Sequence, residues 1–110
     1  MARVTHYHTT KEGIKHYLFF CPGCKEHHEP NSRIWQFNED FDRPTFSPSI
    51  LVSKPRSGPY CHSFVRDGRI EFLPDCKHEL AGQTVDLPEL YACFGLCYFR
   101  SGRSITLYFC

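Results

Sequence analysis

The sequence carries almost no excess of charge of either sign. In a chain of 110 residues, 13 Lys and Arg face 12 Asp and Glu, which gives a formal net charge of +1. A balance this even provides no overall field that would attract nucleic acid or an anionic membrane. The basic residues near the middle of the chain are interspersed with Asp67 and Glu71, so no local basic patch is evident either.

Long hydrophobic runs are also missing. The longest apolar stretch, residues 90–99, is half of the roughly 20 residues that a membrane-spanning helix needs, and Gly95 interrupts it. The first residues include no apolar segment of the kind that forms a secretory signal peptide. We therefore expect a cytoplasmic protein without membrane association.

Familiar catalytic signatures are absent as well. The chain has no His-Glu-x-x-His helix, no deaminase His-x-Glu followed by Pro-Cys-x-x-Cys, no glycine-rich phosphate loop and no Gly-x-Ser-x-Gly nucleophile turn. The sequence therefore leaves open whether the protein is an enzyme, and favours a non-enzymatic role.

The composition does supply the apolar material for a folded core. Hydrophobic residues make up 41% of the chain and aromatic residues 15%, and ten residues are Phe. No repeat or linker divides the chain, so we expect one domain over residues 1–110, with residues 90–110 as a C-terminal aromatic hairpin.

Alternation of apolar and polar residues predicts a mostly β fold of antiparallel hairpins. The clearest signal is a hairpin of residues 60–66 and 69–73, joined by Asp67-Gly68, a dipeptide suited to a two-residue turn. Further alternating stretches predict strands at residues 3–9, 14–20 and 33–38. Residues 75–82 predict the one short helix, which Asp75 would cap and Gly82 would end.

Cysteine is abundant, and its number is odd. Seven cysteines in a chain without an apolar leader indicate free thiols in a reducing compartment rather than a disulfide framework. Cys21-Pro22-Gly23-Cys24 has the spacing of half a zinc site. The sequence therefore predicts a Zn²⁺ cofactor that stabilises a small domain.

A structural Zn²⁺ takes four thiolate or imidazole ligands, so two ligands must come from elsewhere in the chain. The candidates are His27, His28, Cys61, His62, Cys76 and His78. Cys61 and His62 are neighbours on a predicted strand, so their side chains point to opposite faces and only one of them should ligate. The preferred set is Cys21, Cys24, Cys61 and His78. His62 in place of Cys61 is nearly as good, and Cys76 is a reserve.

The other histidines and cysteines carry weaker signals. His6 and His8 share one face of the first predicted strand, but no third ligand is in view, so we expect a solvent-facing strand surface. Cys93, Cys97 and Cys110 have no histidine near them in sequence, and we expect them to pack within the fold.

Six segments together resemble a family of small proteins common in bacteriophages and prophages, which often carry the label "ammonia monooxygenase". They are Cys21-Pro22-Gly23-Cys24, Trp35-Gln36-Phe37-Asn38, Pro44-Thr45-Phe46-Ser47-Pro48-Ser49-Ile50, Cys61-His62-Ser63-Phe64, Asp67-Gly68 and His78-Glu79-Leu80-Ala81-Gly82-Gln83-Thr84. The resemblance covers residues 16–88, and the tail from Leu90 departs from it. The label is physically implausible, because that oxygenase is a copper-dependent membrane complex, whereas thiol-rich ligands suit zinc.

The resemblance implies a zinc site whose motif residues are Cys21, Cys24, Cys61, His62 and His78. Relatives of this kind occur in phage genomes and beside some bacterial ubiquitin-like conjugation genes. The resemblance implies no particular reaction. If a phage encodes the chain, it acts in the host cytoplasm.

We therefore expect a non-enzymatic, zinc-stabilised phage accessory protein that binds a host protein, with inhibition of a host defence system as one use of that binding. A homo-oligomer is compatible with this expectation. The interaction surface we expect in the tail consists of Tyr98, Phe99, Arg100, Arg103 and Tyr108. One alternative is a zinc-dependent hydrolase with Glu79 or Asp75 as its base. The other is a nucleic-acid-binding zinc ribbon that uses Arg66 and Arg69, which the even charge disfavours.

Overall fold

Strands and turns make up the part of the protein that the computed structural model describes. This part comprises residues 2–56, 58–93, 96–101 and 104–109, with side chains described only as far as residue 90. Within it, no helix is present, and accordingly none has the length and apolarity to cross a membrane. The predicted mostly β fold class is confirmed.

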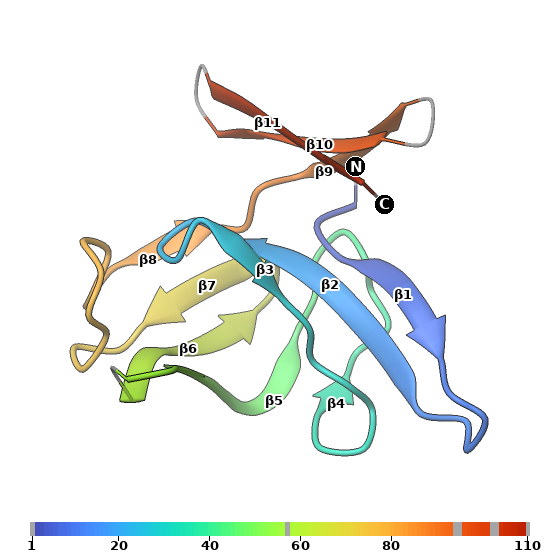
Figure 1. Ribbon diagram of the computed structural model, residues 1–110, viewed down its shortest axis with the longest axis horizontal. Coiled ribbons are helices and arrows are strands. Elements are labelled where there is room, and N and C mark those ends of the chain that lie inside the picture. Colours follow the sequence, from blue (N-terminus) through green and yellow to red (C-terminus); the bar gives the residue numbers. More distant parts are fainter. Residues whose placement is uncertain (1, 57, 94–95, 102–103, 110) are drawn as a thin grey trace.

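The strands form three antiparallel sheets (Figure 1). The first sheet has the order β1-β2-β3, with β1 at Thr5–Thr9, β2 at Lys15–Cys21 and β3 at Glu26–His28. The second has the order β4-β5-β6-β7-β8, with β4 at Gln36–Phe37, β5 at Phe46–Lys54, β6 at Gly58–Arg66, β7 at Arg69–Phe72 and β8 at Thr84–Asp86. The third has the order β11-β10-β9, with β9 at Leu90–Cys93, β10 at Leu96–Ser101 and β11 at Ser104–Phe109.

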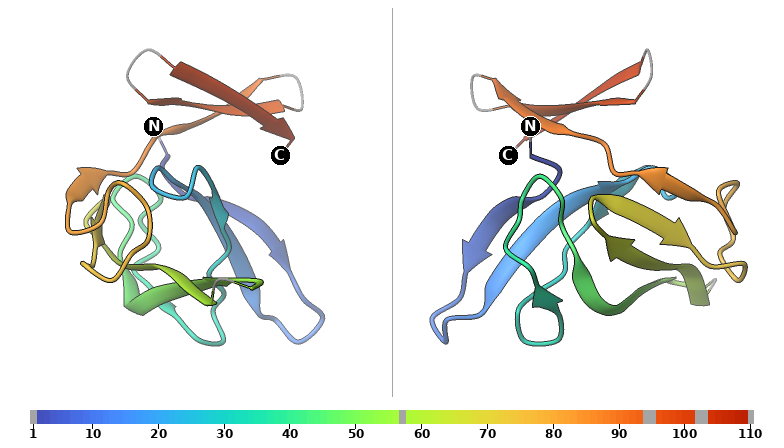
Figure 2. Two further views of the ribbon diagram at one scale, coloured as in Figure 1. Left: turned by 60° about the vertical axis from the view of Figure 1, so that its left-hand side comes forward. Right: turned by 180° about the vertical axis from the view of Figure 1, so that it is seen from behind.

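The hydrophobic core lies between the first sheet and the five-stranded sheet, which face each other in Figure 2. Aromatic side chains from both sheets meet there. The ring of Tyr17 on β2 lies 4.7 Å from that of Phe37 and 6.1 Å from that of Phe46, measured between centroids, and Phe37 stacks on Phe46 at 4.6 Å. Each sheet is therefore apolar on its inner face, as two packed layers require.

The predicted hairpin at residues 60–73 is confirmed as β6 and β7, and Asp67 and Gly68 form its turn with positive φ angles of 51° and 79°. The predicted first two strands match β1 and β2, each shifted by one or two residues. In the tail, the expected hairpin is present as β10 and β11, and β9 adds a third strand beside β10.

The predicted helix at residues 75–82 is wrong. These residues form a series of separate turns, because long-range partners take the groups that a helix would use. The N–H of Lys77 donates to the carbonyl of Tyr60 on β6, and the carboxylate of Asp75 lies against His62 instead of capping a helix. A segment held this closely to a neighbouring strand cannot also close helical hydrogen bonds.

Candidate functional site

A bulge in β5 determines how Ser49 is presented. Phe46 pairs with Val65 and Ile50 pairs with Ser63, so three residues of β5 lie opposite the single residue Phe64 of β6. Pro48 lies in this interval and has no N–H to contribute to the ladder, which favours a break in pairing there. Bulges of this kind redirect side chains and are frequent beside functional sites.

The redirected hydroxyl meets a histidine on the next strand. The Oγ of Ser49 lies 3.0 Å from Nε2 of His62, and Nδ1 of His62 lies 3.2 Å from Oδ2 of Asp75. A carboxylate only accepts hydrogen bonds, so Nδ1 of His62 carries the proton and donates it to Asp75. In the neutral ring Nε2 is then the acceptor, and the hydroxyl of Ser49 donates to it.

The three residues, called the triad below, have the arrangement that activates a serine for attack on a carbonyl carbon. A serine hydroxyl is a weak nucleophile until a neighbouring base takes its proton, and a third group that orients the base completes the arrangement. Such triads recur on unrelated folds and in different chain orders, so they are recognised by geometry and not by sequence position. The order here is serine, histidine, aspartate.

Cys76 fixes the relation between His62 and the segment that carries Asp75. The N–H of His62 donates to Sγ of Cys76 at 3.2 Å, and the thiol of Cys76 donates to the carbonyl of His62 at 3.1 Å. Cys76 is buried and directly follows Asp75. One side chain thus bonds both main-chain groups of His62 and holds the aspartate within reach of the imidazole.

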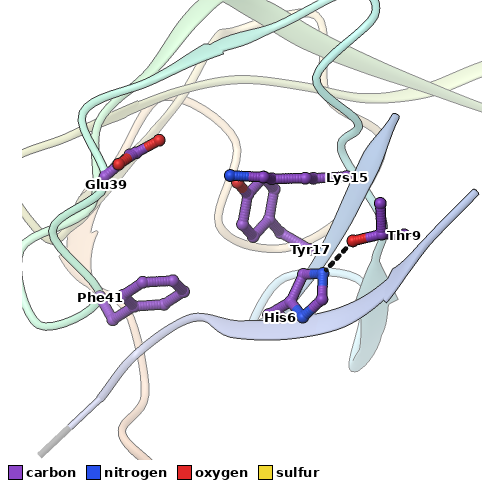
Figure 3. A pocket seen from close by; sticks show the side chains of 6 residues that line it. All are labelled: His6, Thr9, Lys15, Tyr17, Glu39 and Phe41. Carbon is purple, nitrogen blue, oxygen red and sulfur yellow. Dashed lines mark hydrogen bonds between the residues drawn. The ribbon is translucent and has the colours of Figure 1, made fainter. Parts of the chain in front are cut away.

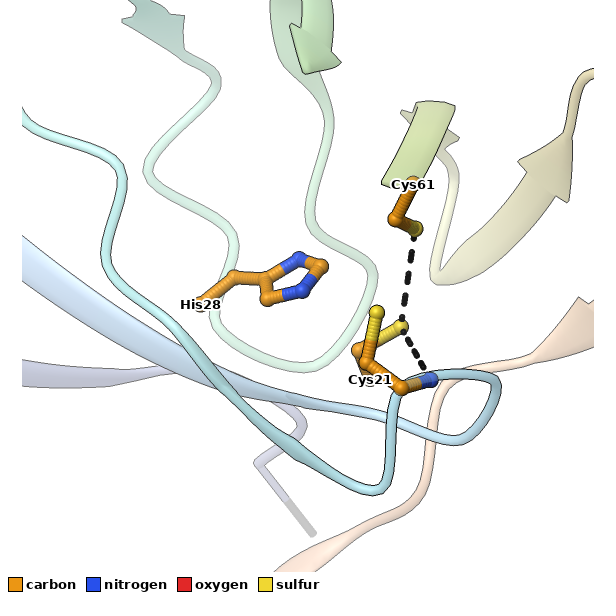
Figure 4. Close-up of side chains that lie close together, drawn as sticks. Cys21, His28 and Cys61 are labelled. Carbon is orange, nitrogen blue, oxygen red and sulfur yellow. Dashed lines mark hydrogen bonds between the residues drawn. The ribbon is translucent and has the colours of Figure 1, made fainter. Parts of the chain in front are cut away.

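A second group of polar side chains lies on the inner face of β6. Cys21, Cys24, His28 and Cys61, called the cysteine–histidine cluster below, have ligand atoms that all lie within 4.8 Å of one another. Figure 4 shows the ring of His28 facing the thiols of Cys21 and Cys61. The Sγ atoms of Cys21 and Cys61 are 4.0 Å apart, close to the spacing of about 3.8 Å that two thiolates adopt on one tetrahedral Zn²⁺.

Both ring nitrogens of His28 support metal binding at this cluster. His28 is buried, and among the described residues neither nitrogen has a hydrogen-bond partner. An imidazole buried without a partner is costly unless something else satisfies it. A metal ion bound by the three thiolates and one nitrogen of His28 would satisfy that nitrogen.

Hydrogen bonds within the cysteine–histidine cluster stabilise a thiolate. Hydrogen bonds from Cys24 and Cys61 lower the pKa of the Cys21 thiol to about 4, whereas its hydrogen bonds to Cys21 and Cys24, together with burial, raise the pKa of Cys61. The hydrogen-bonded thiols therefore favour one negative charge within the cluster. A bound cation would favour loss of the remaining protons, as thiolate ligation requires.

His78 lies on the other side of Cys61. Its Nε2 is 3.4 Å from Sγ of Cys61, and its Nδ1 accepts the N–H of Leu80 at 3.2 Å. Because Nδ1 accepts, the proton of the neutral ring is on Nε2, which donates it to the sulfur. His78 also packs on Gly23, where a Cβ atom would overlap the imidazole. A further group with metal-binding spacing joins Cys61 and His78 to Cys76.

The structure does not bring the imidazole of His62 to Cys21, Cys24 and Cys61. Its side chain leaves β6 on the face opposite to that of Cys61, as the alternation of a strand requires, and meets Ser49 and Asp75 instead. Four of the five residues of the predicted zinc motif, namely Cys21, Cys24, Cys61 and His78, do lie together around Cys61. Their role as ligands stays a prediction.

Two further groups lie apart from the triad. A cavity of about 220 Å³ beside β1 and β2 is shown in Figure 3 and is lined by His6, Thr9, Lys15, Tyr17, Glu39 and Phe41. His6 bonds Oγ1 of Thr9 at 2.9 Å, and His8 stacks on His16 at 4.4 Å between centroids.

The interaction surface predicted at Tyr98, Phe99, Arg100, Arg103 and Tyr108 falls outside the described side chains, so it stays a prediction.

Sequence reasoning missed Ser49 as a functional residue. It identified His62 as a metal-ligand candidate and Asp75 as a candidate base, but it did not connect either of them with a serine. The three residues are spaced 13 apart in the chain, and the antiparallel pairing of β5 with β6 brings the serine to the histidine. The available signal was Pro48-Ser49 before an apolar strand, which is too common to single out a nucleophile.

Comparison with known proteins identifies one family. Residues 1–73 match the family model described as bacterial ubiquitination-like system serine protease, BubE. No curated protein and no solved structure matches the chain. The matched region contains Ser49 and His62 and ends two residues before Asp75.

This match corrects the function expected from the sequence. A non-enzymatic phage accessory protein is contradicted, because the family is one of serine proteases. The expectation was wrong because no linear catalytic signature is present, although the serine, histidine and aspartate are assembled in space. The match spans well over half of the 110 residues, and the chain therefore belongs to the BubE family of bacterial ubiquitination-like system serine proteases.

Proposed function

We propose that the protein is a serine peptidase of a bacterial ubiquitin-like conjugation system, with Ser49 as nucleophile, His62 as general base and Asp75 as the carboxylate that orients His62. The observation that carries the proposal is the pair of hydrogen bonds at 3.0 and 3.2 Å that join these three side chains. The description of the family supports the same reaction class. The substrate class we propose is the peptide or isopeptide bond that follows a ubiquitin-like modifier.

The first half of the reaction forms an acyl-enzyme. The Oγ of Ser49 attacks the carbonyl carbon of the scissile bond while Nε2 of His62 takes the hydroxyl proton. Asp75 stabilises the imidazolium that results, without accepting its proton. Collapse of the tetrahedral intermediate breaks the C–N bond, and His62 gives the proton to the leaving amine.

The second half of the reaction regenerates the enzyme. Water attacks the ester on Ser49, Nε2 of His62 takes a proton from the water, and the carboxylic acid leaves as the proton returns to Ser49. The triad lies on the outer face of the five-stranded sheet, and the side chain of Asp75 is 60% exposed. Ser49 itself is only partly buried, so water and a protein substrate can both reach its hydroxyl.

Cleavage of a modifier fusion tests the proposal. A ubiquitin-like modifier from a bacterial conjugation system is fused through its C terminus to a fluorescent protein and incubated with the purified enzyme. We expect one cut at the modifier's C terminus, no cut with the Ser49→Ala variant and no cut after treatment with a fluorophosphonate. Cleavage that persists in the Ser49→Ala variant, or an uncut fusion with the wild-type enzyme, would contradict the proposal.

The metal ion that we propose is Zn²⁺, held by Cys21, Cys24, His28 and Cys61. Three thiolates and one imidazole form a closed tetrahedral set, which is typical of a structural zinc site. His78, which was preferred as a ligand on spacing, instead donates a hydrogen bond to the sulfur of Cys61. Donation of this kind to a metal-bound thiolate orients the ligand and tunes its basicity.

The bridge formed by Cys76 leads to a prediction about activity. The Cys76→Ala variant leaves the buried N–H of His62 without a partner, so we expect unfolding stability to fall by about 1–3 kcal/mol. We expect kcat/KM for the modifier fusion to fall about tenfold, the effect of roughly 1.4 kcal/mol in the transition state. Urea unfolding and initial rates of fusion cleavage measure the two effects.

The matched control is Cys76→Ser, whose hydroxyl can both donate and accept. It should recover most of the activity and restore the pH profile of kcat/KM, because the imidazole of His62 regains its orientation. An alanine variant as active as the wild type, or a serine variant no better than the alanine variant, would contradict a positioning role for Cys76.

A further inference from the structure

The edge of β5 next to Ser49 exposes main-chain hydrogen-bonding groups. Leu51 lies opposite His62 in the antiparallel β5–β6 pair. The N–H and C=O of His62 point toward the β7 side, where they bond Sγ of Cys76 and the N–H of Leu73. In an antiparallel pair, the N–H and C=O groups of two opposite residues either bond each other or all point away from the partner strand. The N–H and C=O of Leu51 therefore point away from β6.

No strand of the described chain covers this edge beyond the bulge. β4 pairs with β5 only through Gln36 and Phe37, which lie opposite Ser47 and Phe46. The main chain of β5 after Ser49 is therefore a sheet edge, with Leu51 as its outward-facing residue. An open edge of this kind is a template for another extended chain.

A groove runs along the same edge. Its volume is about 350 Å³, and its lining residues are His27, His28, Glu29, Pro30, Trp35, Ile50, Leu51, Val52 and Ser53. Four of them are consecutive residues of β5. Successive side chains of a strand point to opposite faces, so a groove that touches four in a row lies along the backbone edge and not over one face.

The groove, called the β5 groove below, starts at Ile50, the residue that follows Ser49. Nε1 of Trp35 donates to the carbonyl of Ser49 at 3.3 Å, so the indole that lines the groove also contacts the nucleophilic residue. Leu51 lines the groove, is 51% exposed and lies opposite His62 on β6. The nucleophilic residue and the open edge are thus joined by the Trp35 contact and by adjacent residues of β5.

We propose that the β5 groove binds the substrate as an added β-strand, with main-chain hydrogen bonds to the outward N–H and C=O of Leu51. This inference rests on the proposed peptidase function. The occupant is an extended polypeptide segment on one side of the scissile bond, such as the C-terminal tail of a modifier. Four residues of β5 span about 13 Å, which accommodates three to four substrate residues.

Covalent probes with and without a peptide arm test this inference. A small alkyl fluorophosphonate reports on the triad alone, and a pool of tetrapeptidyl diphenyl phosphonates with randomised side chains also occupies the groove. A third pool carries N-methyl groups along the tetrapeptide arm. The measured quantity is the ratio of second-order labelling rates, peptidyl pool over N-methylated pool, with the small probe as the reference for each protein.

In the wild-type enzyme we expect the peptidyl pool to react about tenfold faster than the N-methylated pool, because N-methylation removes main-chain donors. In the Leu51→Pro variant, which lacks the outward N–H that would donate to a substrate carbonyl, labelling by the peptidyl pool relative to the small probe should fall about tenfold. Leu51→Ala removes the side chain and keeps the N–H, so its peptidyl rate relative to the small probe should stay near the wild-type value.

A wild-type ratio near 1 overturns strand addition, whether or not the proline variant folds. Equal peptidyl rates, relative to the small probe, in the alanine and proline variants overturn it as well, because the side chain of Leu51 would then account for the effect. Failure of the small probe to label the wild-type enzyme would reject the proposed peptidase itself. Normal labelling by the small probe with no preference for the unmethylated arm would reject only the β5 groove.

Discussion

Replacing Ser49 with alanine is expected to reduce cleavage of the modifier fusion by roughly 10⁴- to 10⁶-fold, which is the usual cost of losing the nucleophile of a triad. The hydroxyl of Ser49 is the group proposed to form the covalent bond, and among the described residues no other serine is hydrogen-bonded to the side chain of His62. Initial rates at substrate concentrations well below KM give the loss in kcat/KM directly.

Combining substitutions tests whether the triad acts as a unit. Because the base serves only to activate the nucleophile, the Ser49→Ala/His62→Ala double variant should be about as slow as Ser49→Ala alone. Ser47→Ala is the matched control, because Ser47 is exposed and lies on the same bulged segment of β5. Losses that multiply in the double variant, or a Ser47→Ala variant as impaired as Ser49→Ala, would contradict the assignment.

Removal of the metal ion is expected to unfold the protein. Apparent binding free energies of structural Zn²⁺ are about 10 kcal/mol or more, as large as the whole folding stability of a small domain. Three of the four proposed ligands, Cys21, Cys61 and His28, are also buried among the apolar residues of the core. Stripping with a strong chelator should therefore abolish the near-ultraviolet circular dichroism and the cleavage activity together.

Two histidine variants separate the proposed ligand from its neighbour. We expect His28→Ala to lose most of its zinc, and His78→Ala to keep one zinc per chain with weaker affinity. Metal content after gel filtration, measured by atomic absorption, distinguishes the two. The ligand assignment fails if His78→Ala loses the metal and His28→Ala retains it, and the structural role fails if the stripped protein keeps its circular dichroism.

The two sites are coupled through consecutive residues of β6. Cys61 points inward to the cysteine–histidine cluster and His62 points outward to Ser49, because side chains alternate along a strand. An ion that fixes Cys61 therefore also fixes the backbone that presents the catalytic imidazole. If Zn²⁺ binds as proposed, this coupling would make the ion necessary for the reaction although it takes no part in the chemistry.

Local sequence signals predicted the elements whose determinants are local. The β6–β7 hairpin followed from Asp67-Gly68 between alternating strands, and the half-site from the spacing of Cys21 and Cys24. The helix at residues 75–82 was wrong because its determinants are distant. The side chains of Asp75 and Cys76 and the main chain of Lys77 all bond to β6, an arrangement that capping and propensity do not anticipate.

The triad could not be predicted because it depends on strand register. Antiparallel pairing of β5 with β6 brings Ser49 to His62, and the bulge that leaves three residues of β5 opposite one residue of β6 hides this register from the sequence pattern. His62 was predicted as a possible zinc ligand together with its sequence neighbour Cys61, although alternation in a strand places the two side chains on opposite faces. The face of β6 on which the His62 side chain lies thus distinguishes a metal ligand from the proposed general base.

Labelling with diisopropyl fluorophosphate, followed by mass spectrometry of the digested protein, tests the central claim most directly. The account predicts one phosphoryl group per chain, attached to Ser49, with labelling abolished in His62→Ala and strongly slowed in Asp75→Asn. A label on Ser47, Ser53 or Ser63, or labelling of Ser49 that proceeds equally fast without His62, would contradict it.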